Sequence, residues 1–161
     1  MAWHPIRRTE QYLDHKPWPI VPFQPVLFLF LWAASIRLLL SDQPPPNFTH
    51  IAGGTGFYGM WLGMGIIGPM MALASWFLVK KRSGRTRFVG MWVRLGGDII
   101  TFTSVLTYHV SLALEYWGTE ERIYARYAQG AVLVFMASLI VRDIWMLILV
   151  ERLARDIHRR S

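Results

Sequence analysis

The sequence predicts an all-α integral membrane protein, a four-helix bundle formed as one membrane domain over residues 1–161, with the N and C termini cytoplasmic. Three observations lead to this fold class. Hydrophobic residues make up 53% of the 161 residues and charged residues only 17%, whereas soluble domains carry about 25% charged residues. Four segments approach the roughly 20 apolar residues that a membrane helix needs. Lys and Arg residues also gather in alternate connections between those segments.

The four segments lie at about 25–40, 57–79, 88–116 and 127–150. None shows the strict apolar–polar alternation of a barrel strand, so each is expected to be helical. Charged residues interrupt the last two. The first could instead be a signal peptide, but its long N-terminal lead is broken by four prolines, which argues against cleavage: Pro17, Pro19, Pro22 and Pro25.

The placement of basic residues predicts the orientation. The N-terminal segment, the second connection and the C-terminal tail together hold twelve Lys or Arg residues, against two in the other connections. Cytoplasmic loops carry such an excess, so we expect both termini and the second connection to face the cytoplasm. The net charge of +7 is therefore a topology signal, and the expected partner is the lipid bilayer, with no nucleic acid.

Four charged residues lie away from the ends of the last two segments and form a candidate intramembrane charge network. Arg94 and Asp98 are four residues apart, on one face of a helix and within pairing reach. Arg142 and Asp143 lie at a comparable depth in the fourth segment, which should run antiparallel beside the third. A charge inside a span needs a partner or a role. The network could be a latch that fixes helix register, a proton or ion relay, or a contact with partner chains.

Two histidines form a second candidate site. His109 lies in the outer half of the third segment, and His50 precedes the second segment on the same expected side. Two imidazoles could bind haem, or they could handle protons, but a histidine paired with a neighbouring Glu or Tyr is the simpler interpretation. No metal site is expected, and the chain has no Cys. No cofactor is expected, with haem kept as the alternative.

Glycines in the second segment predict close helix packing. Gly59 and Gly63, and likewise Gly68 and Ala72, form small-residue pairs at a spacing of four, which lets helix backbones approach one another. The packing could occur within the monomer, in a homo-oligomer or against partner membrane subunits. A phosphate-binding loop is excluded, because no G-K-[ST] sequence follows the glycines.

The general layout resembles small four-span membrane proteins of actinobacteria and their phages, some of which are holin-like. The C-terminal stretch RDIWMLILVERLARDIH carries part of this resemblance, together with short loops and basic ends. No diagnostic motif accompanies it, so no family residue is carried over. A holin would imply timed oligomerisation in the cytoplasmic membrane and leakage of a lysis enzyme. The excess of Arg over Lys, 14 to 3, is typical of a GC-rich bacterial or phage gene.

No catalytic constellation appears, so we do not expect an enzyme. The leading hypothesis is a non-enzymatic multi-pass protein of the bacterial cytoplasmic (inner) membrane that acts by helix–helix association, as an accessory or scaffold subunit. One alternative is a holin-like oligomeric pore former. The other is a haem-binding or proton-handling subunit that uses His109 and the charge network.

Overall fold

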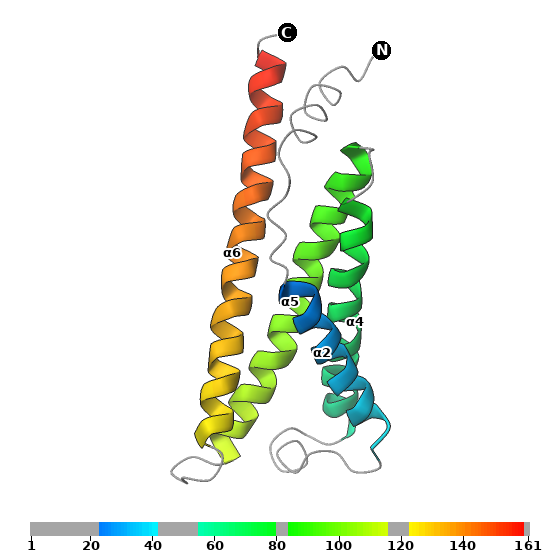
Figure 1. Ribbon diagram of the computed structural model, residues 1–161, viewed down its shortest axis with the longest axis vertical. Helices are drawn as coiled ribbons and strands as arrows, with labels where there is room; N and C mark the ends of the chain where they lie inside the picture. Colours follow the sequence, from blue (N-terminus) through cyan, green and yellow to red (C-terminus); the bar gives the residue numbers. More distant parts are fainter. Residues whose placement is uncertain (1–22, 42–54, 80–83, 116–122, 160–161) are drawn as a thin grey trace.

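The computed structural model describes residues 23–41, 55–79, 84–115 and 123–159. These residues form four helices (Figure 1): α2 (Phe23–Leu39), α4 (Thr55–Val79), α5 (Gly84–Glu115) and α6 (Ile123–Arg159). The all-helical prediction is confirmed for this part of the chain. Each helix overlaps one of the four apolar segments. This is expected for a chain that crosses lipid, because such a chain must satisfy its backbone hydrogen bonds within its own helices.

Three of the four helices, α4, α5 and α6, are long and apolar enough to cross a membrane. Helix α2 has 17 residues, which corresponds to about 25 Å at 1.5 Å per residue. A hydrocarbon core is about 30 Å thick, so α2 alone falls short of a full crossing. A multi-pass membrane protein is therefore supported, while a fourth crossing and the cytoplasmic location of both termini stay predictions.

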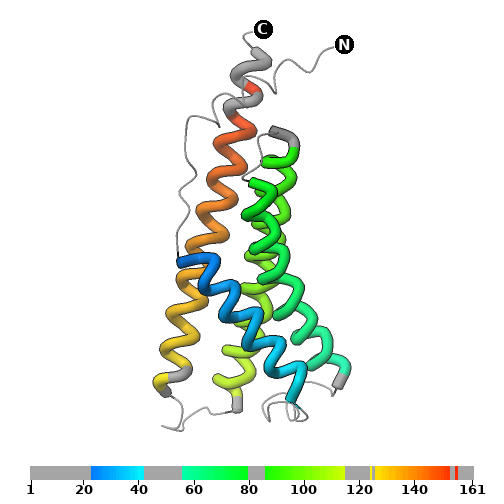
Figure 2. Tube along the Cα trace, turned by 45° about the vertical axis from the view of Figure 1, so that its right-hand side comes forward, coloured from blue at the N-terminus to red at the C-terminus, as the bar shows by residue number. Residues whose placement is uncertain are grey.

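The helices α4, α5 and α6 lie roughly along the long axis of the molecule, with α5 between the other two (Figure 1). Helix α5 runs antiparallel to both α4 and α6, as the short connections require. Helix α2 begins at mid-height close to α6 and runs diagonally to the end of the bundle where α4 starts (Figure 2). The first turn of α2 therefore lies beside α6, with Gln24 buried and Phe23 exposed.

The main hydrophobic core lies where α2 crosses the other helices. Leu27 and Phe28 of α2 pack with Ala72 of α4 and Met136 of α6, and both Phe28 and Met136 are almost fully buried. Phe23 also contacts Phe135 edge-on, with ring centroids 6.1 Å apart. These contacts hold the first turn of α2 against α6.

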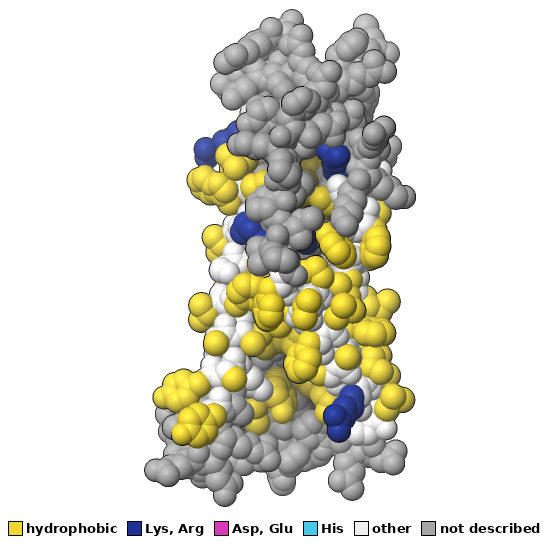
Figure 3. All heavy atoms as spheres, in the orientation of Figure 1, with side chains coloured by type: hydrophobic (Ala, Val, Ile, Leu, Met, Phe, Trp, Pro, Cys, Tyr) yellow, Lys and Arg dark blue, Asp and Glu magenta, His cyan; other side chains and the backbone are white. Residues whose placement is uncertain are grey.

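The outer surface is apolar, as expected for a protein in lipid. Large hydrophobic side chains are exposed along every described helix, and they cover most of the described surface on the face that Figure 3 shows. On α4 the exposed side chains recur at helical spacing: Met60, Ile67, Met70 and Phe77. In water such a surface would cause aggregation, whereas in a bilayer it is the normal lipid-facing surface.

Candidate functional site

The charged residues of the predicted network come together in the middle of the bundle. Arg94 and Asp98 lie on α5, and Arg142 and Asp143 lie on α6. Asp98 is near the centre of the candidate span Thr86–Leu114, about 21 Å from the start of α5 at 1.5 Å per residue. The structure thus gathers four ionisable groups at the depth of the candidate membrane-spanning segments.

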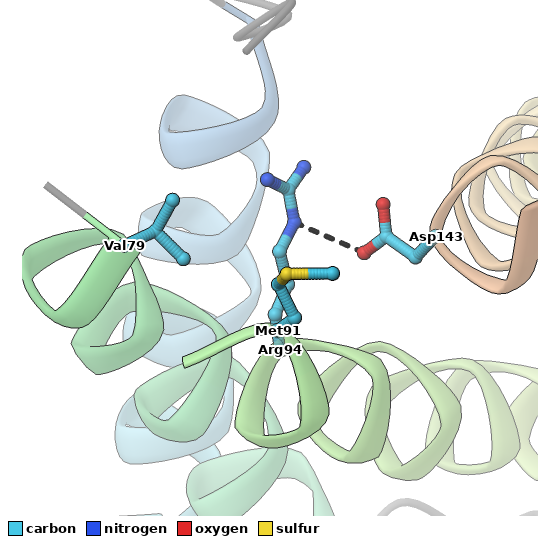
Figure 4. Close-up of a pocket in the computed structure, with 4 residues that line it drawn as sticks. All are labelled: Val79, Met91, Arg94 and Asp143. Carbon is cyan, nitrogen blue, oxygen red and sulfur yellow. Dashed lines mark ion pairs between the residues drawn. The ribbon is translucent and has the colours of Figure 1, made fainter. Parts of the chain in front are cut away.

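Asp143 is the acceptor at the centre of this site. The Nε atom of Arg94 lies 3.0 Å from its Oδ2 atom, and the two side chains point toward one another across the gap between α5 and α6 (Figure 4). Arg142 donates to the other oxygen, Oδ1, through Nε at 2.9 Å and Nη2 at 2.7 Å. One carboxylate therefore holds two guanidinium groups. Arg142 binds it through charge-assisted hydrogen bonds, which are the strong kind, and Arg94 binds it through an ion pair.

Gln24, in the first turn of α2, is a member of the site that the sequence did not reveal. Its Oε1 atom accepts a hydrogen bond from Nη2 of Arg94 and another from Nη2 of Arg142 at 3.2 Å. Gln24 is buried, with 5% of its surface exposed. The only available signal was a polar side chain at the head of an apolar segment. Through Gln24 the site joins three helices.

The sequence placed Arg94 and Asp98 on one helix face within pairing reach, and both residues belong to the site. Arg94 reaches across to Asp143 instead, and no ion pair within 4 Å joins Arg94 to Asp98. Asp98 is 1% exposed, and neither of its oxygens receives a hydrogen bond from a described residue. It interacts with the carboxyl group of Asp143 and, through charge alone, with the two guanidiniums.

Two small cavities border the site. One, of about 10 Å³, is lined by Val79, Met91, Arg94 and Asp143 (Figure 4). The other, of about 20 Å³, lies on the opposite side of Arg94, beside Gln24, Phe28 and Ser75. A water molecule needs roughly 10–15 Å³ and several polar partners. Each cavity therefore has room for about one water next to a charged group.

The other polar side chains of α5 are accounted for by its own backbone or by α4. The hydroxyls of Thr101, Thr103 and Thr107 each donate to the carbonyl four residues earlier, which satisfies a hydroxyl in an apolar setting at little cost. Nε1 of Trp61 donates to the carbonyl of Ser104 at 2.8 Å and so ties α4 to α5. These groups are structural. Among the described residues of α5, the buried polar side-chain atoms without a hydrogen bond are the two oxygens of Asp98 and Nδ1 of His109.

His109 lines a separate groove between α5 and α6, near the end of the bundle where these two helices are connected. The groove has a volume of about 520 Å³, and Arg126, Tyr127 and Gly130 also line it. The Nδ1 atom of His109 is buried and has no hydrogen-bond partner among the described residues. His50 lies outside the described residues, so the pairing of the two histidines stays a prediction. Within the described ranges, no three His, Cys, Asp or Glu residues are grouped as a metal site would require.

The predicted glycine pairs divide into two kinds. Gly68 and Ala72 lie at the closest approach of α4 to α5, where a Cβ atom added to Gly97 would stand 2.6 Å from the backbone nitrogen of Ala72. Added Cβ atoms on Gly59 and Gly63 would meet nothing within 4 Å. Packing within the monomer is therefore wrong for Gly59 and Gly63 as far as the described residues show. Gly97, which the spacing rule missed, is the glycine on which the contact depends.

No family model, curated protein or solved structure matches this chain.

Proposed function

We propose that this chain is a non-enzymatic multi-pass membrane protein that acts by helix–helix association, as an accessory or scaffold subunit of an assembly in the bacterial cytoplasmic membrane. The observation that carries the proposal is a glycine face on α4 that the described residues of the monomer leave open. Gly56, Gly59 and Gly63 share one side of the helix by their spacing of three and four residues. Added Cβ atoms on all three would meet open space.

Other glycines of the bundle, unlike those of this face, lie at helix contacts within the monomer. Gly68 and Gly97 are needed because two backbones touch there. A glycine in a helix costs about 1 kcal/mol relative to alanine, and nothing in the described part of the monomer offsets that cost at Gly59 or Gly63. In membranes, small residues at this spacing let a second helix approach closely. A second copy of the chain or a partner subunit would supply that helix.

Association can be measured as energy transfer between donor-labelled and acceptor-labelled copies in lipid vesicles at a fixed protein-to-lipid ratio. The double variant Gly59→Ile and Gly63→Ile should lower the transfer while the helical content stays unchanged. Gly130→Ile is the matched control, because Gly130 lies on α6 and also has open space around its Cβ position. It should leave the transfer unchanged.

A heteromeric partner calls for a second readout. Cross-linking of the tagged full chain in bacterial membranes should give a defined larger species that the double variant loses and the Gly130 variant keeps. The proposal fails if neither energy transfer nor cross-linking depends on Gly59 and Gly63. Loss of membrane potential on expression would favour the pore-forming alternative instead.

A further inference from the structure

We propose that Asp98 is a proton-binding site inside the membrane: it holds a proton, donates a hydrogen bond to the carboxylate of Asp143, and exchanges that proton with water at the Val79 end of the bundle. This role is independent of the helix association proposed above. If the site were only a structural latch, Asp98 would have no hydrogen-bond partner. A bound proton gives Asp98 a hydrogen bond to Asp143.

The hydrogen-bond donors of the site are directed away from Asp98. Arg94 and Arg142 direct donors to Asp143 and to the oxygen of Gln24. No described donor reaches either oxygen of Asp98, which is 1% exposed. An ionised carboxylate accepts hydrogen bonds only, whereas a protonated one supplies a donor of its own. A buried carboxyl without donors therefore takes up a proton rather than remain charged.

The charged groups around the two carboxyl groups favour a proton on Asp98 over a proton on Asp143. On α6, Asp143 and Arg142 face Asp98, and on α5 Arg94 does. On α2 the polar group at the site is the neutral Gln24, which accepts from both guanidiniums, and α4 contains no acidic or basic residue. Two neighbouring carboxyl groups do not readily ionise together. Asp143 keeps the negative charge because both guanidiniums bind it directly, so the proton resides on Asp98.

The site also has a route to water. Exposure falls toward Asp98: the side chain of Arg142 is 22% exposed, that of Arg94 12% and that of Asp143 6%. The cavity beside Arg94 and Asp143 is also bordered by Val79, the last residue of α4. A proton from water in this cavity passes to Asp143 and then to Asp98, and it returns by the same groups. No other bond forms or breaks.

Infrared spectroscopy of the full chain in lipid tests the protonation directly. Exposed Asp and Glu side chains are ionised at pH 7, so a carbonyl stretch of a protonated carboxylic acid at that pH would report a buried one. The wild-type protein should show this band and Asp98→Asn should lack it. Glu151→Gln, which alters an exposed carboxylate, should keep it. Asp98→Glu should keep the band at a shifted frequency, which provides a second variant if the asparagine form does not fold.

Isotope exchange tests the route. Transfer to D₂O should shift the band, and Val79→Phe should slow the shift severalfold by filling the cavity. Val134→Phe, on the exposed surface of α6, is the control and should leave the rate unchanged. A wild-type spectrum without the band at pH 7, or a band that survives in Asp98→Asn, would overturn the proton site. An exchange rate that Val79→Phe does not change would overturn the route.

Discussion

The contact between α4 and α5 allows a prediction from a pair of adjacent glycines. Gly96 and Gly97 follow one another on α5, yet they face different surroundings. A Cβ atom on Gly97 would lie 2.6 Å from the nitrogen of Ala72 and 2.8 Å from the carbonyl oxygen of Gly68. A Cβ atom on Gly96 would meet only the terminal methyl of Met71, at 3.5 Å. Gly97→Ala should therefore destabilise the protein and Gly96→Ala should not.

The magnitude follows from the kind of atoms in contact. The atoms facing Gly97 belong to the backbone of α4, so no side-chain rotation can relieve the clash, and the helices must separate by about 1 Å to restore normal carbon contacts of roughly 3.5–4.0 Å. Overpacking of this kind costs about 1–3 kcal/mol. Both variants gain up to about 1 kcal/mol of helix propensity, and only Gly97→Ala has the cost of overpacking. The two variants should thus differ in stability by about 1–3 kcal/mol.

Reversible unfolding by increasing mole fractions of SDS in mixed micelles, followed by far-ultraviolet circular dichroism, measures this difference. The midpoint of Gly97→Ala should fall below that of the wild type, and the midpoint of Gly96→Ala should equal or exceed it. Equal midpoints for the two variants would show that α4 and α5 do not approach one another at Gly97, and the reasoning would then be refuted.

Three further predictions use the same unfolding assay. Asp143→Asn removes the negative charge that both guanidiniums bind and should cost about 3–5 kcal/mol. A double variant that also carries Arg94→Gln should lose less than the sum of the two single changes, and strict additivity would argue against the pair. Trp61→Phe removes the hydrogen bond to the carbonyl of Ser104 but keeps an aromatic ring stacked on Tyr108. The free energy of unfolding should therefore fall by about 1 kcal/mol, and a fall several times larger would contradict this account of Trp61. Arg155→Ala breaks an exposed ion pair with Glu151, 3.3 Å long, and should change stability by no more than about 0.5 kcal/mol; a larger change would show that this end of α6 is in contact with something else.

The sequence predicted the helices well because lipid leaves the backbone few choices. The segment at 57–79 corresponds closely to α4, since both its ends pass directly into polar connections. The segment at 127–150 is only the middle part of α6, which continues to Arg159. Hydropathy identifies the lipid-soluble stretch, whereas a helix continues into water as long as its residues favour it.

The membership of the charged site was predictable, but its pairing was not. Four intramembrane charges at similar depth had to meet in a bundle, because each is costly alone. The choice of Asp143 over Asp98 as the partner of Arg94 depends on how α6 sits against α5. Gln24 joins the site only because α2 begins at mid-height. Both are tertiary facts, which spacing along one helix cannot encode.

The same limit applies to the glycines. A spacing of four identifies Gly59 with Gly63 and Gly68 with Ala72 equally well. Only the structure shows that the second pair faces α5 and the first does not. Gly97 has Thr101, and neither Gly nor Ala, at a spacing of four on its own helix, so a rule applied to Gly and Ala alone passes over the residue that the contact needs most.

The charged site also imposes an order on the biogenesis of the protein. Its members lie on α2, α5 and α6, so the site is complete only after the final helix has been synthesised and inserted. Before α6 is in place, Arg94 has no Asp143 to bind. Asp98 lies four residues away on the same helix, within pairing reach. The pairing that the finished bundle does not use is therefore open to the growing chain until α6 supplies Asp143.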